Sequence, residues 1–393
     1  MPTSVIVSGA RTPIGRLNGA LASLSAVDLG AHAIRSALGR AGLAPEHVDY
    51  VVMGQVLQAG SGQMPARQAA VQAGIPLVTP AVSVNKVCLS GIDAVIAADM
   101  MIRAGEFDTV VAGGMESMTN APLLLPGLRA GYRQPPTLLD SALHDGLTDA
   151  SEQMAMGAVT DRHNAKLGIS RQEQDAYAVE SHQRAARAQQ DGRFEEEIAP
   201  IQVPQPKGPP LTVSRDEGVR PDTSLERLAQ LQLSFDAGGT ITAATSSPLS
   251  DGACALVVMS RDKAVELGLE WIAEIGPHAR VAGPDTSLHS QPSQAILHAL
   301  GKSDAGMADL DVIEINEAFA AVALQSMRDL GIGPERVNPD GGAIALGHPI
   351  GMSGARLVLH LALALRQRGG GTGAAALCGG GGQGDALLLT AAR

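Results

Sequence analysis

The chain has 393 residues, a formal net charge of −11 and 45% hydrophobic residues. This length and apolar content suffice for a large buried core and two or three domains' worth of structure, and they exclude a disordered chain. The acidic balance argues against nucleic acid as a partner, because binding to phosphate backbones requires a basic surface.

Cysteine usage and hydropathy narrow the class further. The three cysteines, Cys88, Cys254 and Cys378, are too few and too scattered for a disulfide framework or a C-x-x-C zinc site, so we expect a reducing compartment and no structural metal. No apolar run approaches the ~20 residues that cross a bilayer. The N-terminus also lacks the pattern of a signal peptide. A cytoplasmic protein with no membrane partner is expected.

Short β-branched runs alternate with Ala-rich helical patterns in the first third of the chain. The expected elements, in chain order, are strands at 4–7 and 51–53, a helix at 66–73, a strand at 82–84, a helix at about 91–103 and a strand at 109–112. The last of these strands is expected to end at Gly113-Gly114. Strands separated by helices indicate βαβ units and a mostly parallel sheet covered on both faces.

The middle of the chain differs in composition. Residues from about 115 to 247 include Pro-rich, polar and charged stretches. One long helix is clear there, because the capping box Ser170–Glu173 precedes a helical run to about Gln190. We interpret this region as a large insertion that shapes substrate access, or as an oligomerisation arm, or both.

The last third repeats the order of the first. A strand at 311–315, a helix opened by Ser353-Gly354 and a strand at 374–378 correspond to a strand at 49–53, a helix opened by Ser90-Gly91 and a strand at 110–112. Such an internal repeat predicts two similar α/β halves packed together.

The stretch VNKVCLSG, residues 84–91, places Cys88 between a strand and the start of a helix. Taken alone, a single cysteine is more often an unreactive core residue. At this junction, however, a thiol faces the N–H groups of the helix N-terminus, which stabilise the thiolate and lower its pKa. Ser90 and Gly91 allow close approach of a ligand or a partner backbone. Cys254 lies in a strand-like run and is expected in the core.

Three further sequence elements favour the interpretation of Cys88 as a nucleophile. His348 lies in a glycine-rich loop, where a lone histidine is usually a surface or cap residue, but the repeat places it close to the position of Cys88, so the two could share a cleft. Cys378 precedes four glycines whose N–H groups can form an oxyanion hole, with a phosphate-binding loop as the alternative. Asn316 ends the strand at 311–315; it could donate to an oxyanion or serve as a helix N-cap.

The chain resembles the thiolase family, and most closely its acetyl-CoA acetyltransferase branch. The motifs that carry this resemblance stand in the family's order and span essentially the whole chain: GARTPIG, GQMPARQAA, VNKVCLSG, VVAGGMESM, EINEAFA, NPDGGAIALGHPIGMSGAR and LCGGGGQG. The resemblance implies two βαβαβαββ halves in a five-layer αβαβα core. It also implies an N-terminal half at 1–118 and 248–270, a loop domain at 119–247 for CoA binding and oligomer contacts, and a C-terminal half at 271–393. A homotetramer, built as a dimer of dimers, is expected.

The resemblance further implies roles for the site residues. Cys88 accepts the acyl group, His348 activates it, and Cys378 handles the α-proton of the second acetyl group. A water held by Asn316, with His348, forms one oxyanion hole, and the N–H groups of Cys88 and Gly380 form the other. The implied reaction joins two acetyl-CoA reversibly into acetoacetyl-CoA and CoA. It requires no metal or redox cofactor, since CoA is substrate and product.

Four residues are expected to bind substrate or CoA. Arg220 and Ser247 match the family's CoA-contact positions, although Arg220 could instead be an exposed solubilising charge. Met156 and Phe319 are the other two.

Two departures from the family pattern bear on specificity. Residues 242–247, TAATSS, stand where TAGNAS is common, and residues 155–157, AMG, stand where many acetyl-specific members have HMG. Pocket polarity and a strict preference for acetoacetyl-CoA are therefore open. The alternatives are a broader-chain 3-ketoacyl-CoA thiolase of fatty-acid β-oxidation and a non-catalytic thiolase-like lipid carrier or scaffold.

Overall fold

The computed structural model describes residues 2–133 and 136–392. Its centre is a mixed ten-stranded sheet. The strands of this sheet, in spatial order, are β14 (Leu310–Ile315), β15 (Gly371–Gly379), β16 (Gln383–Ala391), β13 (Ala273–Ala282), β1 (Ser4–Arg11), β12 (Ser250–Ser260), β5 (Thr109–Ser117), β3 (Tyr50–Gly54) and β4 (Ala81–Val84), with β2 (Gly15–Arg16) paired to β12.

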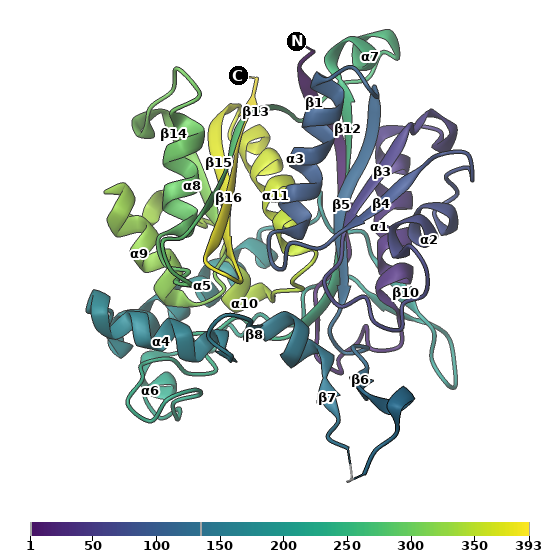
Figure 1. Ribbon diagram of the computed structural model, residues 1–393. Helices are drawn as coiled ribbons and strands as arrows, with labels where there is room; N and C mark the ends of the chain where they lie inside the picture. The colour runs from purple at the N-terminus through teal and green to yellow at the C-terminus, as the bar shows by residue number, and fades with distance from the viewer. Residues whose placement is uncertain (1, 134–135, 393) are drawn as a thin grey trace.

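The helices divide the molecule into five layers (Figure 1). Helices α3 (Ser90–Arg103) and α11 (Ser353–Gln367) lie side by side between the two halves of the sheet. Helices α1 (Ala26–Ala41) and α2 (Pro65–Gln72) cover the outer face of one half, and α8 (Gln291–Leu300) with α9 (Ala320–Leu330) covers the other. The expected αβαβα arrangement is therefore observed.

The sheet is not mostly parallel, as the alternation of strands and helices had predicted. In the described part of the chain, β3 pairs parallel with β4 and β5, and β14 pairs parallel with β15, whereas the other named pairs of this sheet are antiparallel. Parallel pairing requires a crossover connection. β15 and β16 are instead joined directly by a tight turn, which makes them antiparallel. A helix between two strands in the sequence therefore does not mean that all strands of the sheet are parallel.

Three strands are clearly longer than expected, and one of them is β15, which spans Gly371–Gly379 where a strand at 374–378 was expected. β1 continues to Arg11, where it pairs with Cys254 of β12. β5 runs through Gly113 and Gly114 to Ser117. A Cβ on either glycine would overlap a backbone oxygen, that of Cys254 or of Gly351. These glycines permit close backbone packing and do not end the strand.

The internal repeat is present in the topology. β1, α1, β3, α2, β4, α3, β5 and β12 correspond in order to β13, α8, β14, α9, a bridge, α11, β15 and β16. The counterpart of β4 is reduced to a parallel bridge between Ile313 and Val337. One hydrophobic core packs α3 and α11 between the sheet halves, and it contains the fully buried Cys254 as expected.

Most of the loop-domain elements lie below these layers in Figure 1. They are the strand pairs β6–β7 (Leu123–Leu124, Leu139–Asp140), β8–β9 (Thr148–Asp149, Met154–Ala155) and β10–β11 (Ile201–Val203, Leu211–Val213), with α4 (Met156–Leu167), α5 (Arg171–Gln190), α6 (Leu225–Leu228) and a π-helical turn (Ala142–Leu147). The capping box of α5 is confirmed, since the Ser170 hydroxyl accepts from Glu173 N. Two short helices outside this domain are α7 (Arg261–Glu266) and α10 (Ala343–Leu346).

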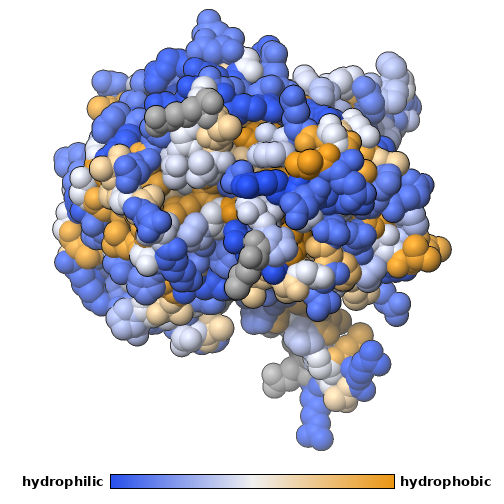
Figure 2. Space-filling model, turned by 90° about the horizontal axis from the view of Figure 1, so that it is seen from above, coloured by the Kyte–Doolittle hydropathy of each residue, from blue (hydrophilic) through white to orange (hydrophobic). Residues whose placement is uncertain are grey.

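Hydrophilic side chains dominate the face on which both chain ends emerge (Figure 2). Among residues 2–133 and 136–392, no helix is long and apolar enough to cross a membrane.

Glycines at the start of α3 and α11 let these two helices meet. A Cβ on Gly91 would lie 2.7 Å from the backbone N of Ala355, and one on Gly354 would overlap the backbone N of Ile92. The two glycines occupy matching positions of the repeat. The close approach that Ser90-Gly91 predicted is therefore that of a partner backbone, and it brings the loops before both helices together.

Replacing Gly354 with alanine is expected to lower the free energy of unfolding by about 2–3 kcal/mol, because the added methyl group meets backbone that cannot rotate away. Gly39 is the matched control. It lies within α1, and nothing in the described part of the chain comes within 4 Å of a methyl group added there, so Gly39→Ala should stabilise by about 0.5–1 kcal/mol. Urea unfolding measures both, and equal effects would contradict the packing argument.

Candidate active site

A cavity of about 350 Å³ opens between the two halves of the fold and residues 143–157 and 235–249. Cys88, His348, Cys378 and Gly380 all line it. Much of the remaining wall is apolar and comes from several separate segments of the chain: Met118, Leu143, Leu147, Ala155, Met156, Phe235, Leu249, Leu288, Phe319 and Ile350. The sequence-predicted reactive groups therefore share one partly enclosed site.

A strained turn presents Cys88 to this cavity. Val87 has φ +50°, which is an outlier for a β-branched residue. Asn85 Oδ1 accepts from Val87 N (3.1 Å). Ser90 Oγ accepts from Lys86 N (2.8 Å) and donates to the Val87 carbonyl (2.6 Å). These side chains hold the turn between β4 and α3 that the glycine-free sequence NKVC would not adopt by itself.

The expected lowering of the Cys88 pKa is wrong for the free protein. Burial raises the pKa of the Cys88 thiol to about 12, and the carboxyl group of Glu116 adds to the rise. The N–H groups of Cys88 and Gly380 act in the opposite direction but do not offset burial. Desolvation therefore favours the neutral thiol of Cys88 in the free protein.

His348 lines the same cavity as Cys88. Its side chain is buried, and its Nδ1 lies 2.6 Å from Ser353 Oγ. Ser353 Oγ also lies 2.9 Å from the Pro349 carbonyl, to which it can donate, and this arrangement fits the tautomer in which Nδ1 carries the proton. Burial, with the charge of Arg356, lowers the pKa of His348 to about 3. The imidazole is therefore neutral, and in this tautomer its Nε2 lone pair accepts from Asn316 Nδ2 at 3.3 Å.

Asn316 follows β14 and meets the same nitrogen. Its Nδ2 lies 3.3 Å from His348 Nε2, while its Oδ1 is buried without a partner in the described residues. Helix α9 starts only at Ala320, so Asn316 is not the N-cap that its residue type had suggested. An unpartnered buried oxygen beside Nε2 is a suitable acceptor for a bound water.

The buried imidazole makes stability depend on pH. Below pH 6.5 the unfolded chain protonates His348, whereas the folded chain does not until about pH 3. The unfolded state thus binds more protons, and stability falls as pH falls. We expect His348 to contribute a loss of about 2 kcal/mol between pH 6.5 and pH 5. Urea unfolding of His348→Gln at both values should show a correspondingly smaller loss; an unchanged difference would contradict a neutral buried histidine.

Cys378 and the glycines after it form a hairpin turn. Cys378 is buried near the end of β15 and pairs with Gly384 of β16. Gly382, with φ +65°, faces the Asp285 carbonyl, and only glycine fits there. Because β16 follows this turn in place of a helix, the phosphate-loop alternative loses its helix N-terminus. Burial, followed by the proximity of Cys88, raises the pKa of Cys378.

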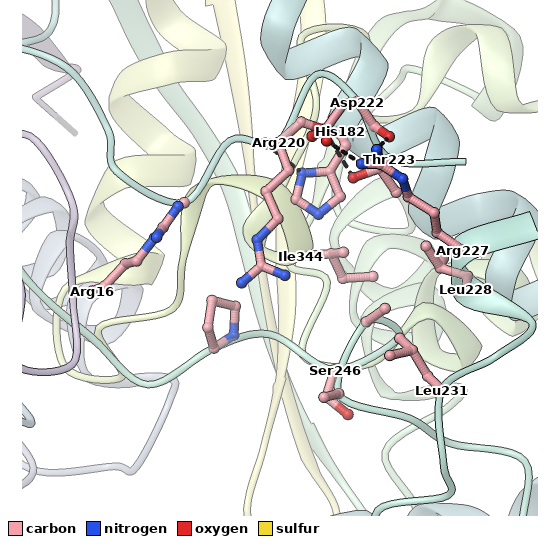
Figure 3. A pocket seen from close by; sticks show the side chains of 14 residues that line it. Arg16, His182, Arg220, Asp222, Thr223, Arg227, Leu228, Leu231, Ser246 and Ile344 are labelled. Atoms are coloured by element: carbon pink, nitrogen blue, oxygen red, sulfur yellow. Dashed lines mark hydrogen bonds and ion pairs between the residues drawn. The ribbon is translucent and has the colours of Figure 1, made fainter. Parts of the chain in front are cut away.

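Of the four expected binding residues, three line the catalytic cavity. These are Met156, Ser247 and Phe319. Arg220 lies instead in a second cavity of about 250 Å³, which shares Pro248 with the first. Figure 3 shows the Arg220 guanidinium reaching into this second cavity, with Arg16 on the opposite side. Arg220 is exposed, as a residue at a cavity mouth would be.

Comparison with known proteins decides the family. A model described as thiolase, N-terminal domain, matches residues 4–262, and one described as thiolase, C-terminal domain, matches residues 269–391. The chain belongs to the thiolase family. This thiolase is 57% identical over 392 residues to a probable acetyl-CoA acetyltransferase of Mycobacterium leprae, covering 100% of both chains.

Two further relatives extend the comparison. An acetyl-CoA acetyltransferase of Cupriavidus necator is 47% identical over 388 residues, covering 98% of this chain and 99% of the relative. A probable acetyl-CoA acyltransferase of Staphylococcus aureus is 46% identical over 366 residues, covering 92% of each. This thiolase is therefore an acyltransferase enzyme.

Some residues at this thiolase's site were not singled out from the sequence. Glu116 lies in the motif VVAGGMESM, yet the motif by itself assigns it no function. Its carboxyl group accepts from Val56 N (3.0 Å), Leu57 N (3.1 Å) and Gly351 N (2.9 Å), and burial raises its pKa to about 7. It ties the loop after β3 to the loop that carries His348. The signal in the sequence was an acidic residue within an otherwise apolar and glycine-rich strand, which predicts a buried carboxylate with a specific partner.

The described residues, 2–133 and 136–392, contain no group of three or more His, Cys, Asp or Glu side chains arranged to hold a metal ion.

Proposed function

We propose that this thiolase is an acetyl-CoA C-acetyltransferase, which condenses two acetyl-CoA reversibly into acetoacetyl-CoA and CoA through an acetyl-Cys88 intermediate. The observation that carries the proposal is the meeting of Cys88, a neutral His348 and Cys378 in one cavity. The acetyltransferase names of two relatives that cover nearly the whole chain support acetyl-CoA as the substrate.

In the first half-reaction His348 Nε2 takes the thiol proton of Cys88, and the sulfur attacks the thioester carbonyl of acetyl-CoA. The carbonyl oxygen becomes an oxyanion, to which the N–H groups of Cys88 and Gly380 donate. As the intermediate collapses, the bond to CoA breaks and the CoA sulfur takes the proton of Cys378. Acetyl-Cys88, an imidazolium at His348 and a thiolate at Cys378 remain.

In the second half-reaction the Cys378 thiolate removes an α-proton from a second acetyl-CoA. The enolate oxygen accepts from His348 Nε2–H and from a water held by Asn316. The enolate carbon attacks the acetyl carbonyl on Cys88, acetoacetyl-CoA forms, and the Cys88 sulfur leaves with the proton of His348. All three groups return to the neutral state that their burial favours at rest.

The CoA moiety is proposed to run from the catalytic cavity into the second cavity. Met156, Phe319 and Ser247 would flank the pantetheine arm, and Arg220 would meet the phosphates. Arg16 also lines the second cavity, as does Arg227, which is paired with Asp222. Arg16 and Arg220 therefore supply the positive charge that an anionic nucleotide requires. The proposed loop domain at 119–247 supplies most of these residues.

A homotetramer remains part of the proposal. The β6–β7 arm stands off the body in Figure 1 and exposes Leu123 (61%), Leu128 (58%) and Leu138 (55%). β4 is an edge strand whose residues are all partly exposed. Large exposed apolar side chains on a projecting arm are typical of interfaces. Light scattering of the purified chain would measure the assembly.

A chain-length profile tests the function. Thiolytic kcat/KM should be highest for acetoacetyl-CoA and fall for longer 3-ketoacyl-CoA. High kcat/KM at C8 or longer, with poor cleavage of acetoacetyl-CoA, would instead establish the broader-chain thiolase. Ala155 in the largely apolar cavity wall is the feature that favours this second candidate, because it adds space without polarity.

A further inference from the structure

An ion pair connects the turn that carries Cys88 with the hairpin that carries Cys378. Lys86 Nζ lies 2.8 Å from both carboxylate oxygens of Asp385. Lys86 precedes Cys88 by two residues, whereas Asp385 lies on β16, directly opposite Leu377 of β15. The pair therefore joins residues that are 299 positions apart, one from each half of the fold.

The pair is nearly enclosed. The Asp385 side chain is fully buried and that of Lys86 is 20% exposed. Asp93, in the first turn of α3, lies 3.6 Å from Lys86 Nζ and accepts from Arg280 Nε at 2.7 Å. A buried charge without its partner is strongly unfavourable, so Asp385 restrains Lys86 tightly.

The two turns that the pair connects touch each other beside the reacting sulfur. A Cβ on Gly379 would lie 2.6 Å from Leu89 Cγ, and one on Gly380 would lie 3.5 Å from Val87 Cγ1. The Gly380 N–H faces Cys88, whose pKa it lowers. Val87 keeps its unfavourable φ only while its surroundings hold it. A movement of either turn would therefore change the spacing between the N–H groups of Cys88 and Gly380.

We propose that Lys86 and Asp385 are positioning residues, whose ion pair holds these two turns together so that the N–H groups of Cys88 and Gly380 converge on the oxyanion formed during acylation. The inference rests on the proposed acylation of Cys88 and adds to it the contact that assembles the oxyanion hole. Neither side chain lines the catalytic cavity, so they act through the backbone that they hold.

Two reactions of the Cys88 sulfur distinguish a role in assembling the oxyanion hole from an effect on the reactivity of the thiol. Acetylation by acetyl-CoA passes through an oxyanion, whereas alkylation by iodoacetamide does not. In Lys86→Met we expect acetylation of Cys88 to slow by roughly 10- to 100-fold, less than loss of a whole oxyanion donor costs. Alkylation should stay within about twofold of the wild-type rate. Intact-protein mass spectrometry after rapid quenching follows both rates.

Further variants keep the test decisive if Lys86→Met folds poorly. Lys86→Met/Asp385→Asn leaves no unpaired buried charge and should acetylate as slowly as either single variant, because the residues act as one unit. Lys86→Arg keeps the pair and should restore most of the rate. Lys263→Met is the matched control, since its pair with Glu266 is a short-range contact within α7.

Two outcomes would overturn the inference alone. One is a folded double variant that acetylates at the wild-type rate. The other is an equal decline of alkylation and acetylation, which would mean that the pair changes the reactivity of the thiol. If wild-type Cys88 were alkylated but never acetylated, the proposed function would fail, and this inference with it.

Discussion

Cys88→Ala is expected to eliminate the acetyl adduct that acetyl-CoA leaves on the wild-type chain, and to lower condensation by at least about 10³-fold. The physical reason is that the thiol is the group that forms the covalent intermediate, and removal of a nucleophile leaves only binding and electrostatic stabilisation. Intact-protein mass spectrometry of the wild-type chain should find a single acetyl group, and peptide mapping should place it on Cys88.

Cys254→Ala provides the control. Cys254 is fully buried on β12 within the central core, so its loss should leave both the adduct and the activity in place. An acetyl group that persists on the Cys88→Ala chain would assign the nucleophile elsewhere. A wild-type chain that stays unmodified would favour a non-catalytic scaffold over the enzyme.

Cys378→Ala is expected to separate the two half-reactions. The variant should still acetylate Cys88, because a CoA thiolate can leave without a proton from Cys378. Condensation should fall by roughly 10²–10⁴-fold, since no other group in the proposal takes the α-proton. A burst of about one CoA per chain, followed by little acetoacetyl-CoA, is the kinetic signature to measure.

Either of two results would contradict that assignment. Condensation at the wild-type rate would remove Cys378 from the proton transfer. Loss of both the acetyl adduct and condensation would mean that Cys378 is required for the first half-reaction, or that the variant does not fold. The melting temperature of the variant distinguishes a folding defect, because Cys378 is buried at the end of β15.

The internal repeat was the most informative feature of the chain. It predicted that the loops before the helices at Ser90 and Ser353 occupy matching positions, and the structure brings Cys88 and His348 to one cavity. The prediction held because Gly91 and Gly354 are local signals, visible in the sequence, of two backbones in contact. The mostly parallel sheet failed for the opposite reason. Whether two strands run parallel depends on which strands become neighbours in the sheet, and the order of strands and helices along the chain does not specify those neighbours.

The electrostatic predictions were likewise right where they depended on local sequence and wrong where they depended on the fold. Placing Cys88 before a helix correctly located the thiol, but the direction of its pKa shift depended on burial by residues from several separate segments of the chain. The tautomer of His348 likewise depends on where Ser353 Oγ lies between His348 Nδ1 and the Pro349 carbonyl, which is a matter of distances. Arg220 matched a motif position, yet only the fold shows that it lies in a separate, adjoining cavity.

By itself the sequence determined the family, the alternation of elements and the two-half architecture, and it predicted the reactive side chains. These properties are carried by local patterns: periodicity, capping residues, glycine placement and short motifs. Only the tertiary structure decided the protonation states, the strain at Val87 and the pairing of Lys86 with Asp385. Those depend on desolvation and on contacts between residues hundreds of positions apart, which exist only once the two halves have packed together.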